Sequence, residues 1–317
     1  MSATAGFSRM ATVRVGMMGM SEGNGHPFSF SAIINGYDDK GLAESGWPGI
    51  YDYVKRRDPS EFGIGSLQVT HAWTQDEEVT RSLCRACRIP HAVRTREEVL
   101  GNVDAVVIAR DDHETHLEMA RPFLEAGLPV FVDKPLSLDL RALAFFRPYL
   151  ESGKLMSCSG MRYARELDEV RASMAEYGRL RLLRGAIVLS WEEYGIHLID
   201  ALFGVTSARP VSVIALDAPH SSMAIALDDG SLLQIDALGE GPRTFRVDVW
   251  GEKHTSTCEI ADNFSMFRRM LWHFAAMIHT GRPVVPARDT LDAMRLLIAG
   301  KMAKQGGKKV LLSDVQV

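Results

Sequence analysis

Two short segments of this sequence combine residues that can handle protons and charge. In FVDKPL, Lys134 directly follows an apolar run, and in EYGIHLID the histidine His197 stands between Glu193 and Asp200. If the second segment is helical, all three side chains share one face, because the spacings correspond to successive helical turns. A histidine beside carboxylates can act as a general base, and a lysine at the end of a parallel strand lies where ligands bind. Each motif alone also fits a plainer interpretation, a surface salt-bridge pattern or a solvated charge at a strand end.

A glycine-rich turn follows the first apolar run of the chain. VRVGMM ends in GMSEGNGHP, and SFSAIINGY then has apolar residues at helical spacing. A strand, a glycine-rich turn and a helix in this order let backbone N–H groups approach a pyrophosphate. Ser21 and Asn24 stand where the dinucleotide pattern has glycine, so a simple tight turn is the alternative. The candidate cofactor-binding residues here are Gly19, Met20, Ser21, Asn24 and Gly25.

The end of the second strand bears on the choice of cofactor. Dinucleotide-binding folds commonly place an acid there to bind the ribose hydroxyls, whereas this sequence has Thr74 and Gln75. Thr74 can hydrogen-bond either a ribose or a 2′-phosphate. The acidic residues that follow, at 76–78, should repel a 2′-phosphate, so we expect NAD or NADP with a preference for NAD. A strand that simply ends in polar residues is the alternative.

Polar residues after the third strand are expected to border the same cofactor. They are Arg110, Asp111 and His116. The nearby HETH segment is one residue short of the zinc motif H-E-x-x-H. The CRAC segment has redox spacing, but it lies late in a predicted helix without a second cysteine pair. We therefore predict neither a metal nor a redox site.

The order of the elements predicts an α/β fold in two parts. Apolar strands alternate with helices up to residue 136, which is typical of a parallel sheet buried on both faces. Strand-like runs separated by short turns then predict a largely antiparallel sheet, and two amphipathic helices close the chain. We expect a Rossmann-like dinucleotide-binding domain over residues 1–136 and an α+β domain for substrate binding and oligomerisation over residues 137–317.

Together these segments resemble the Gfo/Idh/MocA oxidoreductases, the family of glucose-fructose oxidoreductase and inositol dehydrogenase. The resemblance rests on the first turn, VDAVVIA with its following His-bearing helix, VFVDKPL and EEYGIHLIDALFG, and it covers nearly the whole chain. It implies that Lys134 touches both nicotinamide and substrate, and that His197 is the catalytic histidine. Asp133 replaces the usual Glu, and the segment before the catalytic helix is shorter than usual. The residues expected to line the substrate pocket are Arg162, Tyr163, Trp191 and Tyr194.

The expected reaction is NAD(P)-dependent hydride transfer to or from a secondary alcohol or ketone of a sugar or cyclitol-like substrate. His197 would take the hydroxyl proton, Lys134 would stabilise the alkoxide, and Glu193 or Asp200 would orient His197. Two alternatives are an NAD-dependent glycosidase that borrows and returns a hydride, and a non-catalytic dinucleotide-binding regulator.

Composition limits the other functional classes. The chain has 317 residues, 46% of them hydrophobic, and a net charge of −4, which gives no drive toward nucleic acid or anionic membrane. Four cysteines are too few for a disulfide framework, and no apolar run is long enough to span a membrane. The first residues lack the apolar core of a signal peptide. We expect a cytoplasmic enzyme with a small-molecule substrate, assembled as a homodimer or homotetramer.

Overall fold

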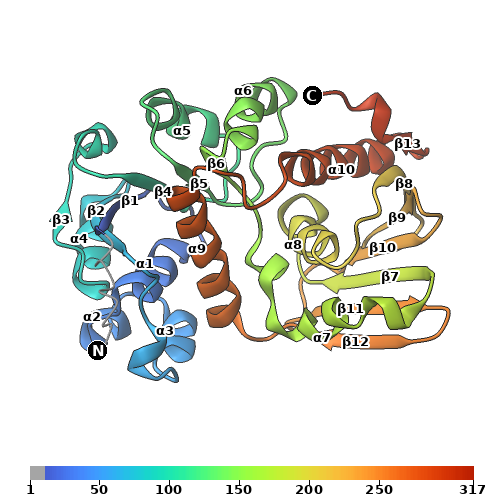
Figure 1. Ribbon diagram of the computed structural model, residues 1–317, viewed down its shortest axis with the longest axis horizontal. Helices are drawn as coiled ribbons and strands as arrows, with labels where there is room; N and C mark the ends of the chain where they lie inside the picture. The colour runs from blue at the N-terminus through green and yellow to red at the C-terminus, as the bar shows by residue number, and fades with distance from the viewer. Residues whose placement is uncertain (1–10) are drawn as a thin grey trace, which may run out of the picture.

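Two β-sheets organise the chain, which the computed structural model describes over residues 11–317 (Figure 1). The prediction that the chain lacks a signal peptide concerns its first ten residues, which lie outside the described part. Among residues 11–317, no helix combines the length and the apolar character that crossing a bilayer requires.

The first sheet is parallel throughout, with the strand order β3-β2-β1-β4-β5-β6. Helices cover both faces, so β4 and β5 are entirely buried. The prediction of a Rossmann-like parallel sheet is thus confirmed. The sheet also continues past residue 136, because β6 pairs with β5. The strands are β1 (Val13–Met18), β2 (Leu67–Trp73), β3 (His91–Ala92), β4 (Ala105–Ile108), β5 (Val130–Val132) and β6 (Leu155–Met156).

Residues 38–65, between α1 and β2, contain three short helices. Asp38 caps the first, Pro48 begins the second, and Asp58 forms a capping box at the third. Each is too short to show a helical hydrophobic period. The helices up to β6 are α1 (His26–Asn35), α2 (Asp39–Ala43), α3 (Pro48–Val54), η1 (Pro59–Glu61), α4 (Glu77–Ala86), η2 (Arg96–Val99), α5 (His116–Glu125) and α6 (Leu140–Glu151).

The second sheet has the order β12-β11-β7-β10-β9-β8-β13, and only the β7–β10 pair is parallel. The prediction of a largely antiparallel second sheet is therefore confirmed as well. Its strands are β7 (Leu180–Ile187), β8 (Pro210–Leu216), β9 (Ser221–Leu227), β10 (Leu232–Ala237), β11 (Phe245–Gly251), β12 (Thr255–Glu259) and β13 (Val310–Leu311). The helices of this part are η3 (Gly160–Tyr163), η4 (Arg165–Leu167), α7 (Asp168–Ala172), η5 (Met174–Tyr177), α8 (Trp191–Phe203), α9 (Asn263–Thr280), α10 (Ala287–Gly306) and η6 (Leu312–Asp314).

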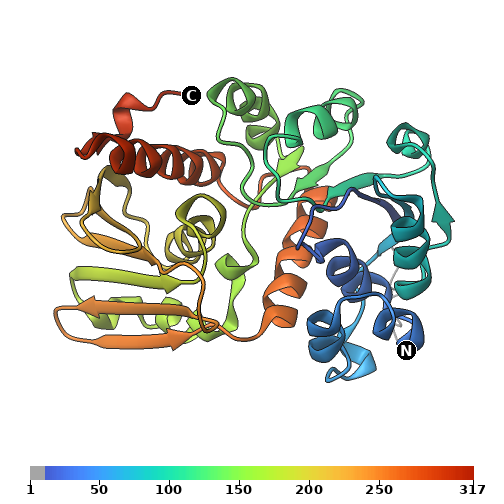
Figure 2. The ribbon, with the colours of Figure 1, turned by 180° about the vertical axis from the view of Figure 1, so that it is seen from behind.

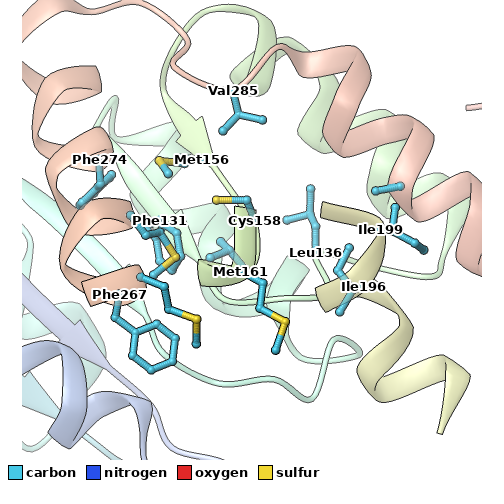
Figure 3. Packing of buried hydrophobic residues seen from close by; sticks show 14 of the residues in the cluster. Phe131, Leu136, Met156, Cys158, Met161, Ile196, Ile199, Phe267, Phe274 and Val285 are labelled. Atoms are coloured by element: carbon cyan, nitrogen blue, oxygen red, sulfur yellow. The ribbon is translucent and has the colours of Figure 1, made fainter. Parts of the chain in front are cut away.

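A buried core joins the two parts of the molecule. The long helix α9 runs between them and packs against α1 and η3 (Figure 2). Phe131 of β5, Met161 of η3, Ile196 of α8 and Phe267 of α9 are all buried in this region (Figure 3). Because dense packing of this kind leaves little freedom, the core fixes the end of β5 relative to α8.

Candidate active site

Lys134 lies just beyond the C-terminal end of β5, at the edge of the parallel sheet where ligands bind in this type of fold. Its side chain is 6% exposed, and its Nζ is 3.4 Å from Oδ2 of Asp111, which follows β4. The same Nζ is 5.9 Å from the centre of the Tyr194 ring on α8. The lysine is therefore nearly desolvated and held between the two parts of the molecule.

His197 lies in the middle of α8 and is buried. Its Nδ1 is 2.6 Å from Oγ of Ser159, and the backbone N–H of Ser159 donates to Oδ2 of Asp200 over 2.6 Å. Asp200 therefore supports His197 only indirectly, through Ser159. Glu193 is exposed, and its carboxylate accepts from the N-cap Ser190 hydroxyl over 2.8 Å instead.

Burial and charge both keep the His197 imidazole neutral. Burial is the largest cause lowering the pKa of His197 well below its usual value, and the charges of Lys134 and His26 lower it further. Burial raises the pKa of Asp200 to about 6, against the opposing effect of Arg162. A neutral imidazole next to a lysine cation is an arrangement that can accept a proton from a hydroxyl while the lysine stabilises the alkoxide.

Two adjoining cavities lie in this region and share Gly23, Asp111 and Tyr194 as lining residues. One, of about 560 Å³, is lined by Lys134, His197 and Tyr194 together with Asn24 and Gly25. The other, of about 730 Å³, is lined by the start of the glycine-rich turn and by the polar residues after β2 and β4, and it also reaches Tyr194. Of the predicted site residues, this second cavity exposes Met20, Ser21, Gln75, Arg110, Asp111, Glu193 and Tyr194. The structure thus brings most of the predicted residues together around two adjoining spaces.

The glycine-rich turn has the features that a dinucleotide requires. Gly19 has φ +77°, and a Cβ there would lie 2.5 Å from Cδ of Arg110, so only glycine fits. The Gln75 side chain accepts from the Met20 backbone N–H over 3.0 Å and donates to its carbonyl over 2.7 Å, which ties the turn to the end of β2. The Ser21 hydroxyl bonds to Asp111. The turn, the cavity and the N-terminus of α1 together fit a nicotinamide dinucleotide.

Besides Gly19, two residues predicted to bind the cofactor, Thr74 and His116, line neither cavity. The Thr74 hydroxyl bonds to the Asp76 carbonyl over 2.6 Å and to the Thr80 hydroxyl over 2.8 Å, so it stabilises the start of α4. His116 is buried, and its two ring nitrogens lie 3.0 and 2.9 Å from the carbonyls of Leu136 and Arg110. His116 therefore links the loops after β4 and β5 rather than facing the cofactor.

Three residues predicted to bind substrate also lie away from Lys134. Arg162, whose side chain is 11% exposed, lies between Asp200, at 3.4 Å, and Asp289, at 2.5 Å. The next residue, Tyr163, stacks on His273 with ring centres 4.3 Å apart. Arg162 and Tyr163 both border a separate cavity. Trp191 is fully buried, and its indole N–H donates to the Leu297 carbonyl over 3.0 Å. Tyr194 alone of this group lines the cavity that holds His197.

Three further residues complete the site. Ser159 supports His197, and the buried carboxylate of Asp133 is 2.5 Å from Nδ1 of His26. His26 also lines the smaller cavity. Sequence reasoning missed His26 and Ser159 because their partners lie far away in the chain. The visible signals were a histidine at the end of the glycine-rich turn and a serine in SCSGMRY.

Within the described residues, no three His, Cys, Asp or Glu side chains gather as metal ligands. The CRAC cysteines do not form a reactive pair. Burial raises the pKa of the Cys84 thiol to about 11 and that of Cys87 further, which disfavours both thiolates.

A parallel Rossmann-like sheet with a glycine-rich turn facing a polar cavity defines a dinucleotide-binding class of protein. Residues 51–145 match the model of the Gfo/Idh/MocA family, described as an oxidoreductase family with an NAD-binding Rossmann fold. The match covers the nucleotide-binding part of the chain, and it supports the resemblance inferred from the sequence.

Solved structures extend this likeness of fold to the whole chain. A probable dehydrogenase from Thermotoga maritima is 16% identical with a TM-score of 0.74, over 96% of this chain and 100% of that one. A myo-inositol dehydrogenase from Corynebacterium glutamicum is 18% identical with a TM-score of 0.73, over 95% and 99%. The scyllo-inositol dehydrogenase from Lactobacillus casei, solved with NAD(H) and scyllo-inositol, is 14% identical with a TM-score of 0.74, over 95% and 99%. None of the curated proteins matches the sequence significantly.

Proposed function

We propose that this protein transfers a hydride between a nicotinamide dinucleotide and a secondary alcohol or ketone of a sugar or cyclitol. The observation that carries the proposal is the meeting of Lys134 and His197, from different parts of the chain, in one cavity that adjoins the glycine-rich turn. The similarity of fold to inositol dehydrogenases supports a polyol as the substrate class.

The bound dinucleotide supplies the hydride acceptor or donor at its nicotinamide ring. We assign its binding to the glycine-rich turn, Gln75, Arg110 and Asp111, with Lys134 nearest the reaction. We favour NAD over NADP, because Asp76 and the two glutamates after it stand at the start of α4, next to the end of β2. Those carboxylates would repel a 2′-phosphate.

The chain's own residues divide the work on the substrate oxygen. The neutral His197 accepts the hydroxyl proton, while the Lys134 ammonium stabilises the negative charge that develops on oxygen. Ser159 holds the His197 ring through Nδ1, and Asp200 holds Ser159. Tyr194, which packs 5.1 Å from the His197 ring, forms a wall common to both cavities.

Two measurements test this function. NADH and NADPH are titrated against tryptophan fluorescence, and a panel of cyclitols, aldoses and sugar acids is then tested for NADH formation with NAD. We expect NADH to bind more tightly than NADPH and at least one polyol to be oxidised. Absence of binding for both nucleotides at millimolar concentration would contradict the proposal. Sugar hydrolysis without net NADH would instead indicate the glycosidase alternative.

We also propose that the second sheet forms a homo-oligomer interface. Ile214, Leu232 and Leu311 are 39%, 40% and 41% exposed. The pairing registers of β13, β8, β9 and β10 place them on one face of the sheet. Val213, which points to the opposite face, where α10 packs, is fully buried. An exposed apolar patch on a sheet favours association with a second copy.

The four free thiols suit a reducing compartment such as the cytoplasm.

A further inference from the structure

The ring of His26 is held firmly at the edge of the proposed reaction cavity. His26 is the first residue of α1, and its Nδ1 is 2.5 Å from Oδ2 of Asp133. Its ring stacks on Phe30 with centres 4.8 Å apart, and it meets Phe267 edge-on at 5.0 Å. These contacts occupy one ring nitrogen and pack the ring against two neighbouring phenyl groups. Nε2 is the nitrogen left for the cavity, which His26 lines together with both proposed catalytic residues.

The bonding of Asp133 fixes the tautomer of His26. Burial alone would raise the pKa of Asp133, but the His26 charge and hydrogen bonds to the carboxylate hold that pKa well below its usual value. Its oxygens also accept from the Asn24 side chain over 3.2 Å and from the Lys134 backbone N–H over 2.9 Å. Because an ionised carboxylate only accepts hydrogen bonds, Nδ1 of His26 must carry a proton. Nε2 therefore keeps a free lone pair when the ring is neutral.

His197 lacks such support for a positive charge. Its Nδ1 partner is the neutral hydroxyl of Ser159, and the ring is buried next to Lys134. An imidazolium at this position is disfavoured by desolvation and by the neighbouring cation. A proton accepted by His197 is thus poorly stabilised there, whereas one on His26 is balanced by Asp133.

On the basis of the proposed function, we propose that His26 is a further catalytic residue: the proton released from the substrate hydroxyl ends on its Nε2, and Asp133 balances the charge. In the oxidation direction the substrate O–H bond breaks and the proton bonds first to His197, then to His26. The carbonyl forms as the C–H electron pair leaves as hydride for the bound dinucleotide. Reduction runs the same steps in reverse, with His26 as the proton source.

The other charged groups around this cavity already have partners or lie at its rim. Lys134 pairs with Asp111, and the rim residue Asp52 is 2.9 Å from Lys55. Arg243 is exposed and donates to the Asn263 side chain over 3.1 Å. The titratable or charged side chains that line the cavity are His26, Asp52, Tyr53, Arg56, Asp111, Lys134, Tyr194, His197 and Arg243. Asp133 is thus the carboxylate placed to stabilise a charge on His26.

The test compares His26→Gln and Asp133→Asn with wild type, using NAD and a polyol that wild type oxidises to measure turnover, and NADH titration to measure cofactor affinity. His279→Gln, which changes an exposed histidine on α9, is the matched control. We expect His26→Gln to lower kcat by about 10²-fold or more, with NADH affinity within a few-fold of wild type. Asp133→Asn should lower kcat by a similar factor, because a proton on His26 then lacks the carboxylate that balances its charge.

The outcomes separate the two proposals. Near-wild-type kcat in His26→Gln, or in a folded, NADH-binding Asp133→Asn, overturns the role of His26 and leaves the proposed function intact. If wild type oxidises no member of the panel, the proposed function fails and the role of His26 fails with it. A loss of NADH binding in both variants would show that the pair only builds the cofactor site, which also overturns the inference.

Discussion

Replacing Lys134 by methionine and His197 by alanine, singly and together, tests whether the two side chains act as one unit. Methionine keeps the length of the lysine without its charge, and alanine removes the ring that Ser159 holds at 2.6 Å. Loss of a proton-handling group typically costs about 10²–10⁴ in rate, or about 2.7–5.4 kcal/mol of barrier. We expect each variant to lose that order of kcat and to keep most of its NADH affinity.

The double variant should lose less than the product of the single losses. Both side chains line one cavity, and the Lys134 charge helps to lower the pKa of His197. Residues that act together on one transition state are non-additive, because the second removal has less left to disrupt. The same electrostatic coupling predicts that the pKa of His197 rises toward its usual value in Lys134→Met.

Steady-state NADH formation measures kcat for all variants, and NMR titration of histidine-labelled protein measures the pKa of His197. Lys253→Met, a change to an exposed lysine, is the matched control. Circular dichroism and NADH titration separate a chemical defect from an unfolded protein. Turnover close to wild type in His197→Ala would remove this residue from the mechanism. Strictly multiplicative losses would refute the coupling between the two side chains.

Three further outcomes follow from particular contacts. Thr74→Val should lower the free energy of unfolding in urea by about 1 kcal/mol and leave NADH affinity unchanged. Gln75→Ala should weaken NADH binding, because the turn loses both of its hydrogen bonds to Gln75. A larger loss of NADH affinity in Thr74→Val than in Gln75→Ala would place Thr74 in the cofactor site. Below pH 6.5 the imidazole of His197 is protonated in the unfolded protein but stays neutral in the folded protein, because burial lowers its pKa. The free energy of unfolding should therefore fall by up to about 1.4 kcal/mol for each pH unit below 6.5. His197→Gln should remove that slope and His279→Gln should keep it. Leu232→Lys should convert an oligomer to monomer in light scattering, and a monomeric wild type would contradict the proposed interface.

The strands of the first sheet could be predicted because each buried run is apolar along most of its length. β1 and β2 begin and end where the sequence indicates. β6 could not be assigned to that sheet, since a two-residue strand has no detectable period. The boundary at residue 136 stays a prediction. The two-residue strand β13, which closes the other sheet beside β8, escaped prediction for the same reason.

Part of the site could be predicted, because some of its residues lie in local sequence patterns that indicate where they are in the fold. Lys134 follows a buried strand, and His197 lies in a segment whose acidic residues recur at helical spacing, so the local pattern predicted both. Arg162 and Trp191 show the limit of this reasoning. Arginine and tryptophan side chains are suited to binding a sugar, but here their polar groups are bonded to residues that are distant in the sequence. Only the packed structure shows that Asp289 and Leu297 satisfy them.

Charge pairing explains how several ionisable groups coexist in one small cavity. Asp111 balances the Lys134 ammonium, and Asp133 is bonded to His26, where it can balance a proton that this ring accepts. His197 has no carboxylate bonded to it in the described structure and stays neutral, as burial requires. A proton arriving from the substrate therefore meets a neutral acceptor first and a carboxylate-backed one beyond it. The lysine cannot share this task, because its charge is needed where the alkoxide forms. This division gives each of the three basic side chains a separate role in one reaction.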